Sequence, residues 1–311
     1  MWIQGSTLSI SQRSLSPELP LSPLQARAQS LASQLIQSYS SRRAIHDALS
    51  FIEEHLSLPC PFEDDVLSLP LPAATLSSLG IPVGFGVKGG AAREALASRL
   101  SLRAAQKPRD IDLVRRGIHR IPADDEVGRA FMGRDFEHGA RVELIRDLGG
   151  YLRSRDLTIN EVTAIDDVVH ASLLCALDTI GHVLRPSRYR SGTLHKAPSL
   201  LGTSLLKMVR LYAEGGVLGE NWSITGIPEE TSFSDFDLAV HLNKAFQRGP
   251  AVADRFLHTL EILSLLPATE NRVERALLEL EHLRHGEKGL FPDVPAELWA
   301  KILMDEKGQE S

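Results

Sequence analysis

The chain has only two cysteines, Cys60 and Cys175, among its 311 residues. They lack the spacing of metal ligands, and two cysteines cannot make a disulfide framework. We therefore expect each to be a small buried hydrophobic residue in a reducing compartment.

Long apolar runs are absent as well. No stretch of eighteen apolar residues occurs, and the first six residues lack the basic start and apolar centre of a secretory signal. We therefore expect a cytoplasmic protein that does not span a membrane. With 311 residues, of which 43% are hydrophobic, the chain can bury a substantial core in about two domains.

Excess positive charge is lacking too, since the formal net charge is −6. This balance argues against a protein coated with basic residues for nucleic acid, but it leaves room for local patches. Residues 99–120 contain seven Lys or Arg against two acids, and residues 182–196 contain four Lys or Arg and no acid. Either stretch is a candidate phosphate-binding surface or an ordinary solvated face.

The first eighty residues predict a helical extension. Residues 1–22 are rich in Ser, Pro and Leu without a sustained period, so we expect a loosely ordered lead-in. Apolar residues recur at helical spacing in residues 24–39 and 42–56, which predicts a helical hairpin. Several prolines in residues 58–82 disfavour long helices and indicate a linker or an edge structure.

The pattern then changes to alternating strands and helices. We expect strands at residues 83–87, 109–114 and 141–145, a helix at 91–102, and a mixed segment at 158–169. Further helices are predicted at residues 200–214, 235–247, 252–266 and 272–284. These elements predict an α+β protein with an N-terminal extension at 1–80, a mixed sheet with flanking helices at 81–170, and a helical region at 171–311.

Two aspartates, Asp110 and Asp112, carry the strongest chemical signal. Residues two apart in a strand point to the same face, so both carboxylates would converge there. Like charges held together favour a bound cation, and Mg²⁺ prefers hard oxygen ligands together with substrate phosphates. A third acid, Glu143, lies in a predicted strand where its apolar neighbours would face the other way. It is a candidate third member of the cluster or an exposed strand residue.

A glycine pair, Gly89 and Gly90, precedes the aspartates by about twenty residues, between a predicted strand and a predicted helix. Glycines there let backbone N–H groups approach a phosphate closely, although a tight turn alone would also explain them. Lys88 and Arg93 are near enough in sequence to contact a triphosphate.

These motifs resemble those of the class II tRNA nucleotidyltransferases, the CCA-adding enzymes, and the bacterial poly(A) polymerases. Three features carry the resemblance, namely Gly89-Gly90-Ala91-Ala92-Arg93, Arg109-Asp110-Ile111-Asp112-Leu113, and Ser154-Arg155-Asp156-Leu157-Thr158-Ile159-Asn160-Glu161. Val183-Leu184-Arg185-Pro186 is similar to the family's exit from the head domain, and Leu205-Leu206-Lys207-Met208-Val209-Arg210-Leu211 to its neck helix. The resemblance covers about residues 83–214.

The resemblance implies a polymerase-β-like nucleotidyltransferase head followed by an all-helical neck and body. It implies that Asp110 and Asp112 hold two Mg²⁺ ions, with Mn²⁺ as a substitute, and that Glu143 orients or deprotonates the nucleophile. Nucleotide contacts are implied for Arg155, Asp156, Asn160, Lys207 and Arg210. The substrate would be an NTP, and the acceptor an RNA 3′ end such as that of tRNA.

The chain also departs from the family. The family carries Glu-Asp-x-x-Arg before the neck helix, whose Asp and Arg read the base, whereas this chain has Leu201 and Ser204 at those two positions. A regulatory or inactive nucleotide-binding or RNA-binding protein with this fold therefore stands as an alternative, as does nucleotidyl transfer to a small molecule or a protein.

Overall fold

The computed structural model describes residues 12–38, 41–104, 111–132, 142–187, 198–228, 231–266 and 271–278. The chain divides into two compact units. One comprises residues 19–193, and the other combines residues 1–18 with residues 194–311. The sequence analysis placed boundaries near residues 80 and 170. Residues of the N-terminal helices belong to the same apolar cluster as those of the sheet.

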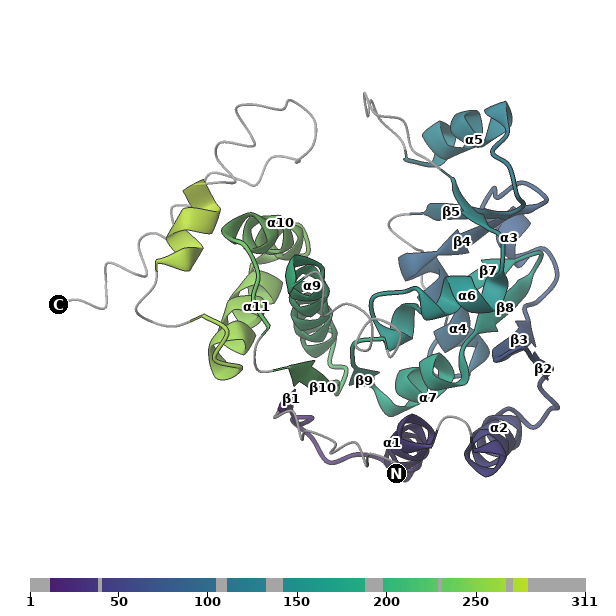
Figure 1. Cartoon of the computed structure of the whole chain (residues 1–311), viewed down its shortest axis with the longest axis horizontal. Helices are drawn as coiled ribbons and strands as arrows, with labels where there is room; N and C mark the ends of the chain where they lie inside the picture. Colours follow the sequence, from purple (N-terminus) through teal and green to yellow (C-terminus); the bar gives the residue numbers. More distant parts are fainter. Residues whose placement is uncertain are drawn as a thin grey trace, which may run out of the picture. The chain divides into compact units, whose positions relative to one another are not determined.

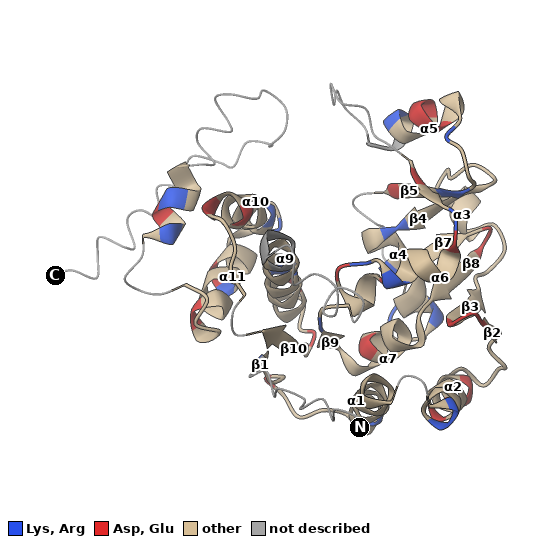
Figure 2. Ribbon diagram, in the orientation of Figure 1, with Lys and Arg blue, Asp and Glu red and all other residues tan. Residues whose placement is uncertain are grey.

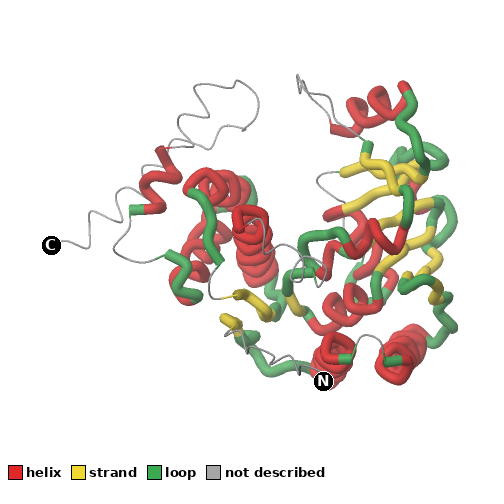
Figure 3. The backbone as a smooth tube through the Cα atoms, viewed as in Figure 1, coloured by secondary structure: helices red, strands yellow, loops and turns green. Residues whose placement is uncertain are grey.

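The larger unit is an α+β arrangement (Figures 1 and 3). Its elements are α1 (Pro23–Gln37), α2 (Arg42–Leu56), β2 (Phe62–Glu63), β3 (Val66–Pro70), α3 (Thr75–Ser78), β4 (Phe85–Lys88), α4 (Gly89–Arg99), β5 (Asp112–Arg116), α5 (Pro122–Met132), β6 (Glu143–Ile145), α6 (Leu148–Arg153), η1 (Thr158–Asn160), β7 (Val162–Ile165), β8 (Val168–Ala171), α7 (Leu173–Gly181) and β9 (Val183–Leu184).

Seven of these strands form one mixed sheet in the order β2-β3-β8-β7-β4-β5-β6. All neighbours are antiparallel except β5 and β6, which are parallel. The predicted α+β class, with a mixed sheet and flanking helices, is thus confirmed. The proline-rich segment after α2 supplies β2 and β3 at one edge of the sheet.

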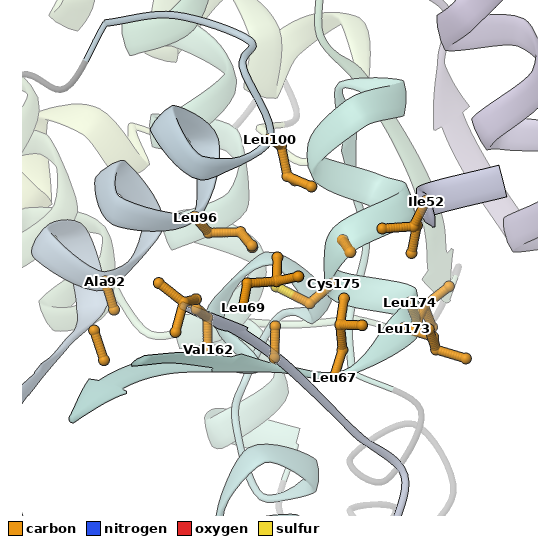
Figure 4. Packing of buried hydrophobic residues seen from close by; sticks show 14 of the residues in the cluster. Ile52, Leu67, Leu69, Ala92, Leu96, Leu100, Val162, Leu173, Leu174 and Cys175 are labelled. Atoms are coloured by element: carbon orange, nitrogen blue, oxygen red, sulfur yellow. The ribbon is translucent and has the colours of Figure 1, made fainter. Parts of the chain in front are cut away.

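Both faces of the sheet are covered. On one face, residues of α1, α2, α4 and α7 form a large apolar cluster with alternate residues of the strands (Figure 4). On the other face, α6 packs on a smaller cluster. Strand β5 shows the alternation, because Leu113 belongs to the first cluster and Val114 to the second.

Local sequence explains why α1 and α2 form. Helix α1 begins with a capping box in which Ser22 and Gln25 exchange hydrogen bonds, and Pro23 follows at its first position. Ser41 caps the start of α2, and Ser57 ends it in a left-handed conformation. Cys60 and Cys175 are both buried, as expected.

The smaller unit is mainly helical. It contains β1 (Gln12–Leu15), α9 (Pro198–Val217), β10 (Ser223–Pro228), α10 (Asp235–Phe246) and α11 (Pro250–Ile262). Strand β1 pairs antiparallel with β10, so part of the expected lead-in is ordered by a segment two hundred residues away. The predicted helix at residues 272–284 lies partly outside the described residues. None of the helices within the described part of the chain is long and apolar enough to cross a membrane.

Candidate active site at the glycine turn

The junction of β4 and α4 places backbone next to the Asp112 carboxylate. Strand β4 ends at Lys88, which pairs with Asp112 of β5, and α4 begins at Gly89. Gly89 has a φ of +62°, and a Cβ added there would lie 2.9 Å from Asp112 Oδ2. The positive φ therefore favours glycine at this position, and a larger residue would also displace the Asp112 carboxylate.

Asp112 is the first residue of β5, and its side chain is exposed. Residues 105–110 lie outside the described part of the chain, so the predicted pairing of Asp110 with Asp112 remains a prediction. Leu113 is buried on the opposite face of the sheet. Side chains therefore alternate along β5 as the sequence analysis expected, with Asp112 on the face opposite to Leu113.

Glu143 lies on the strand next to Asp112. Strand β6 runs parallel to β5, with Glu143 paired to Val114. Since Val114 follows Asp112 by two residues, Asp112 and Glu143 lie on the same face of the sheet. Figure 2 shows basic and acidic segments on the ribbon in the region of β4 and β5.

Two cations bind the Glu143 carboxylate. Lys88 Nζ donates to Oε2 at 2.6 Å, and Arg155 Nη2 donates to Oε1 at 3.1 Å. Burial alone would raise the pKa of Glu143, but the hydrogen bonds and charges of Lys88 and Arg155 outweigh it and lower the pKa. Glu143 is therefore ionised at neutral pH, and each of its two oxygens accepts a hydrogen bond from a cation.

Tyr151, which the sequence analysis did not identify, completes this cluster. Its ring lies 4.0 Å from the Arg155 guanidinium carbon, and its hydroxyl donates to Glu143 Oε2 at 3.4 Å. Burial raises the pKa of the Tyr151 phenol, and the negative charges of Glu143 and Asp112 raise it further against the effect of Arg155. Because the charge of Asp112 affects the Tyr151 phenol, the Asp112 carboxylate lies close enough to interact electrostatically with this cluster.

A chain of hydrogen bonds joins α4 to η1. Arg93 Nη1 donates to Asn160 Oδ1 at 2.5 Å, and Asn160 Nδ2 donates to Asp156 Oδ1 at 2.6 Å. The Leu157 backbone N–H also donates to Asp156 Oδ1, at 2.9 Å. The sequence analysis gave Arg93, Asn160 and Asp156 as candidate nucleotide contacts. The structure joins these three side chains in one chain of hydrogen bonds.

Behind η1 lie two buried acids, Glu161 and Asp178, to which the sequence analysis assigned no role. Glu161 accepts hydrogen bonds from Ser172 Oγ at 2.5 Å and from Ser187 Oγ. Burial raises the pKa of Glu161 to about 7. Asp178 accepts from Thr158 Oγ1 at 2.6 Å and pairs with Arg185. Both acids fix the η1 loop from within the core.

The other predicted nucleotide contacts, Lys207 and Arg210, lie on α9 in the smaller unit. Arg210 is buried and pairs with Glu214, which also pairs with Arg248. Ser204, at the position of the family's base-reading arginine, is buried on the same helix.

A divalent metal ion would fit some of these residues and not others. Asp112 offers an exposed carboxylate, which is a hard oxygen donor of the kind that Mg²⁺ prefers. Glu143 fits less well, because both of its oxygens already accept hydrogen bonds from cations. Within the described residues, no three His, Cys, Asp or Glu side chains gather closely enough to hold a metal ion.

Comparison with known proteins gives a distant structural likeness. No family model matches the chain, and no curated protein matches it. A CCA-adding enzyme from Bacillus stearothermophilus in complex with CTP is 16% identical, with a TM-score of 0.38, over 66% of this chain and 54% of that one. A CCA-adding enzyme in complex with ATP is 17% identical, with a TM-score of 0.30, over 68% of this chain and 49% of that one.

The chain thus spans about half the length of these two enzymes. At this identity and TM-score the likeness assigns no activity to the chain. The functional argument therefore rests on the sequence motifs and on the geometry of the glycine turn.

Proposed function

We propose that the chain is a metal-dependent nucleotidyltransferase that transfers a nucleotide from an NTP to an acceptor hydroxyl and releases pyrophosphate. The observation that carries the proposal is the close approach of the Asp112 carboxylate to Gly89. A strand-end carboxylate and a glycine turn at a helix start are brought together, as a site for a metal-bound triphosphate requires.

The reaction assigns roles to the residues around this turn. The acceptor oxygen forms a bond to the α-phosphorus, the bond from that phosphorus to the β-phosphate bridging oxygen breaks, and the acceptor proton leaves to solvent or a base. Asp112 and Asp110 would hold Mg²⁺, and the bound ion would neutralise the negative charge that develops on the phosphates. The backbone N–H groups at the start of α4, at Gly89 and Gly90, would bind a phosphate.

Arg93 has its orientation fixed before any nucleotide arrives. Asn160 holds the guanidinium, and Asp156 in turn orients the Asn160 amide. A preorganised cation loses less conformational entropy when it binds a phosphate, and catalysis of phosphoryl transfer depends mainly on such positioning. We infer that Asn160 and Asp156 act on the nucleotide through Arg93.

The proposed acceptor is an RNA 3′ end. The support is the motif resemblance over residues 83–214, together with the basic residues Arg188, Arg190 and Lys196. Faithful CCA addition is not part of the proposal, because Leu201 and Ser204 replace the acid and the arginine that read the base. The same replacement favours the second candidate, a regulatory nucleotide-binding or RNA-binding protein without turnover.

One experiment separates these candidates and identifies the substrates. Purified protein is incubated with each α-labelled NTP, Mg²⁺ and total RNA, and the products are resolved and sequenced at their 3′ ends. Incorporation of label with stoichiometric release of pyrophosphate supports the transferase. Binding of NTP without incorporation into RNA or any added small-molecule or protein acceptor supports the regulatory protein.

A further inference from the structure

Glu143 is bound on both oxygens by cations from two different parts of the chain. Its Oε2 accepts from Lys88 at 2.6 Å and lies 3.4 Å from Arg155 Nη1, while its Oε1 accepts from Arg155 Nη2 at 3.1 Å. A metal ion or a substrate proton would have to compete with Lys88 and Arg155 for these two oxygens.

The sheet order explains how Lys88 reaches Glu143. Strand β5 lies between β4, which carries Lys88, and β6, which carries Glu143. The Lys88 side chain therefore crosses β5 on the face that carries Asp112, its partner in register. Its ammonium is fixed over the strand whose first residue is the proposed metal ligand.

Both cations of the cluster are partly withdrawn from water. Lys88 and Arg155 share the Glu143 carboxylate, and the side chains of Lys88, Glu143 and Arg155 are 28%, 33% and 21% exposed. Charges that are partly withdrawn from water interact more strongly with an incoming anion than fully solvated ones do. The Tyr151 ring covers the Arg155 guanidinium at 4.0 Å and restricts its movement.

We propose that Glu143 is a positioning residue that holds Lys88 and Arg155 as a fixed pair of cations for the NTP phosphates, and that it neither binds metal nor takes the proton of the acceptor. This inference rests on the proposed function, since it assigns the phosphates of the same substrate to the cluster. The sequence analysis expected Glu143 to orient or deprotonate the nucleophile. The role proposed here acts instead through Lys88 and Arg155.

The first test measures the binding of inorganic tripolyphosphate to the full chain in EDTA, where no metal contributes. Lys88→Met is expected to weaken binding about tenfold, the equivalent of one charge-assisted hydrogen bond. In a Glu143→Gln background the same Lys88→Met change is expected to weaken binding less than about twofold, because the ammonium is no longer held in place. An equal loss in both backgrounds would overturn the proposal.

The second test measures the binding of Mn²⁺ to the full chain by electron paramagnetic resonance. Glu143→Gln is expected to leave Mn²⁺ affinity unchanged, whereas a Glu143 that binds metal would lose at least tenfold. The matched control is Glu54→Gln, which removes a Glu from an ion pair with Arg27 on the surface of the same unit. Thermal unfolding shows whether each variant is folded. If Lys88→Met is not folded, Arg155→Met takes its place in the first test.

The outcomes distinguish this inference from the proposed function. Wild-type protein that binds neither tripolyphosphate nor any NTP would contradict both. Wild-type protein that binds tripolyphosphate and transfers nucleotides, with no coupling between Lys88 and Glu143, would contradict the positioning role alone. A transfer rate that falls at least a hundredfold in Glu143→Gln, with unchanged KM for the NTP, would also contradict it and would restore the base.

Discussion

Arg93 and Asn160 are joined by a 2.5 Å hydrogen bond that ties the first turns of α4 to the η1 loop. The two residues are 67 positions apart, yet both belong to motifs that the sequence analysis singled out. Asn160 is only 4% exposed and also donates to Asp156. The orientation of Arg93 therefore depends on a buried amide whose own position is fixed.

Replacement of Asn160 by Ala is expected to raise the KM for the NTP about five- to tenfold, with a smaller change in kcat. The reason is that Arg93 loses the acceptor that orients it, at a cost typical of one hydrogen bond to a charged group. Steady-state kinetics of transfer provide the measurement. Thr179→Val removes a hydroxyl that donates to a backbone carbonyl in buried α7, and it should reduce stability without changing KM.

Gly89→Ala is expected to abolish at least nine-tenths of the transfer activity. The added Cβ would lie 2.9 Å from Asp112 Oδ2 and would displace that carboxylate. Gly84→Ala is the matched control, because Gly84 also has a positive φ, of +81°, but has nothing within 4 Å of its added Cβ. Both variants should lose about 1 kcal/mol of stability through backbone strain, and only Gly89→Ala should lose activity.

Leu96→Ala tests the packing that supports the glycine turn from α4. Leu96 is fully buried in the large apolar cluster, so its truncation is expected to lower the free energy of unfolding by about 2–5 kcal/mol. Urea denaturation gives this value. Val83 is 98% exposed, and Val83→Ala should change stability by less than about 0.5 kcal/mol. A small loss for Leu96→Ala would contradict the described core.

Glu161 predicts a dependence of stability on pH. Burial raises its pKa to about 7 in the folded protein, whereas an unfolded glutamate has a pKa of about 4.3. The folded state thus binds more protons between these values, and its stability should fall as pH rises from about 4.5 to 7. Urea denaturation gives the free energy of unfolding across pH 5–8. Over this range Glu161 should lower it by at most about 3 kcal/mol in the wild type, and Glu161→Gln should remove that decrease. An identical pH dependence in the two proteins would contradict a raised pKa.

Base choice is the property in which this chain should differ most from the family it resembles. Leu201 has no polar side-chain atom, and the Ser204 hydroxyl is too short to reproduce a two-pronged arginine contact. We therefore expect weak discrimination among the four NTPs, or a preference set by other residues such as Lys207. The assay offers a tRNA that lacks its 3′ CCA together with CTP and ATP. Ordered addition of C, C and A would contradict this expectation.

Much of the fold followed from the sequence, because local patterns determine it. Apolar spacing predicted α1 and α2. The helix expected at residues 91–102 is α4, although it begins two residues earlier, at the glycine pair itself. Strand β1 was missed, since its order comes from pairing with β10 rather than from its own residues. The helical region after residue 173 likewise contains β9 and β10, whose short strands have no strong period.

The candidate site was predictable only in part, for a similar reason. The motifs identify Asp112, Gly89 and Asn160 individually as candidate functional residues, but they do not show how these residues contact one another. The binding of Glu143 by Lys88 and Arg155 depends on β5 lying between β4 and β6, and no local pattern determines strand order. Tyr151 was missed because a tyrosine in a short helix carries no motif until its ring is seen beside Arg155.

The central claim is that Asp112 serves nucleotide transfer, and one comparison tests it most directly. Wild-type protein, Asp112→Asn and the surface control Asp47→Asn are incubated with α-labelled NTP, Mg²⁺ and RNA, and the initial rate of label transfer is measured. We predict transfer by the wild type and by Asp47→Asn, and a rate at least about a hundredfold lower for folded Asp112→Asn, as expected when charge stabilisation at the reacting phosphate is lost. Near-normal transfer by Asp112→Asn, or no transfer by the wild type with any of the four NTPs, would contradict the claim.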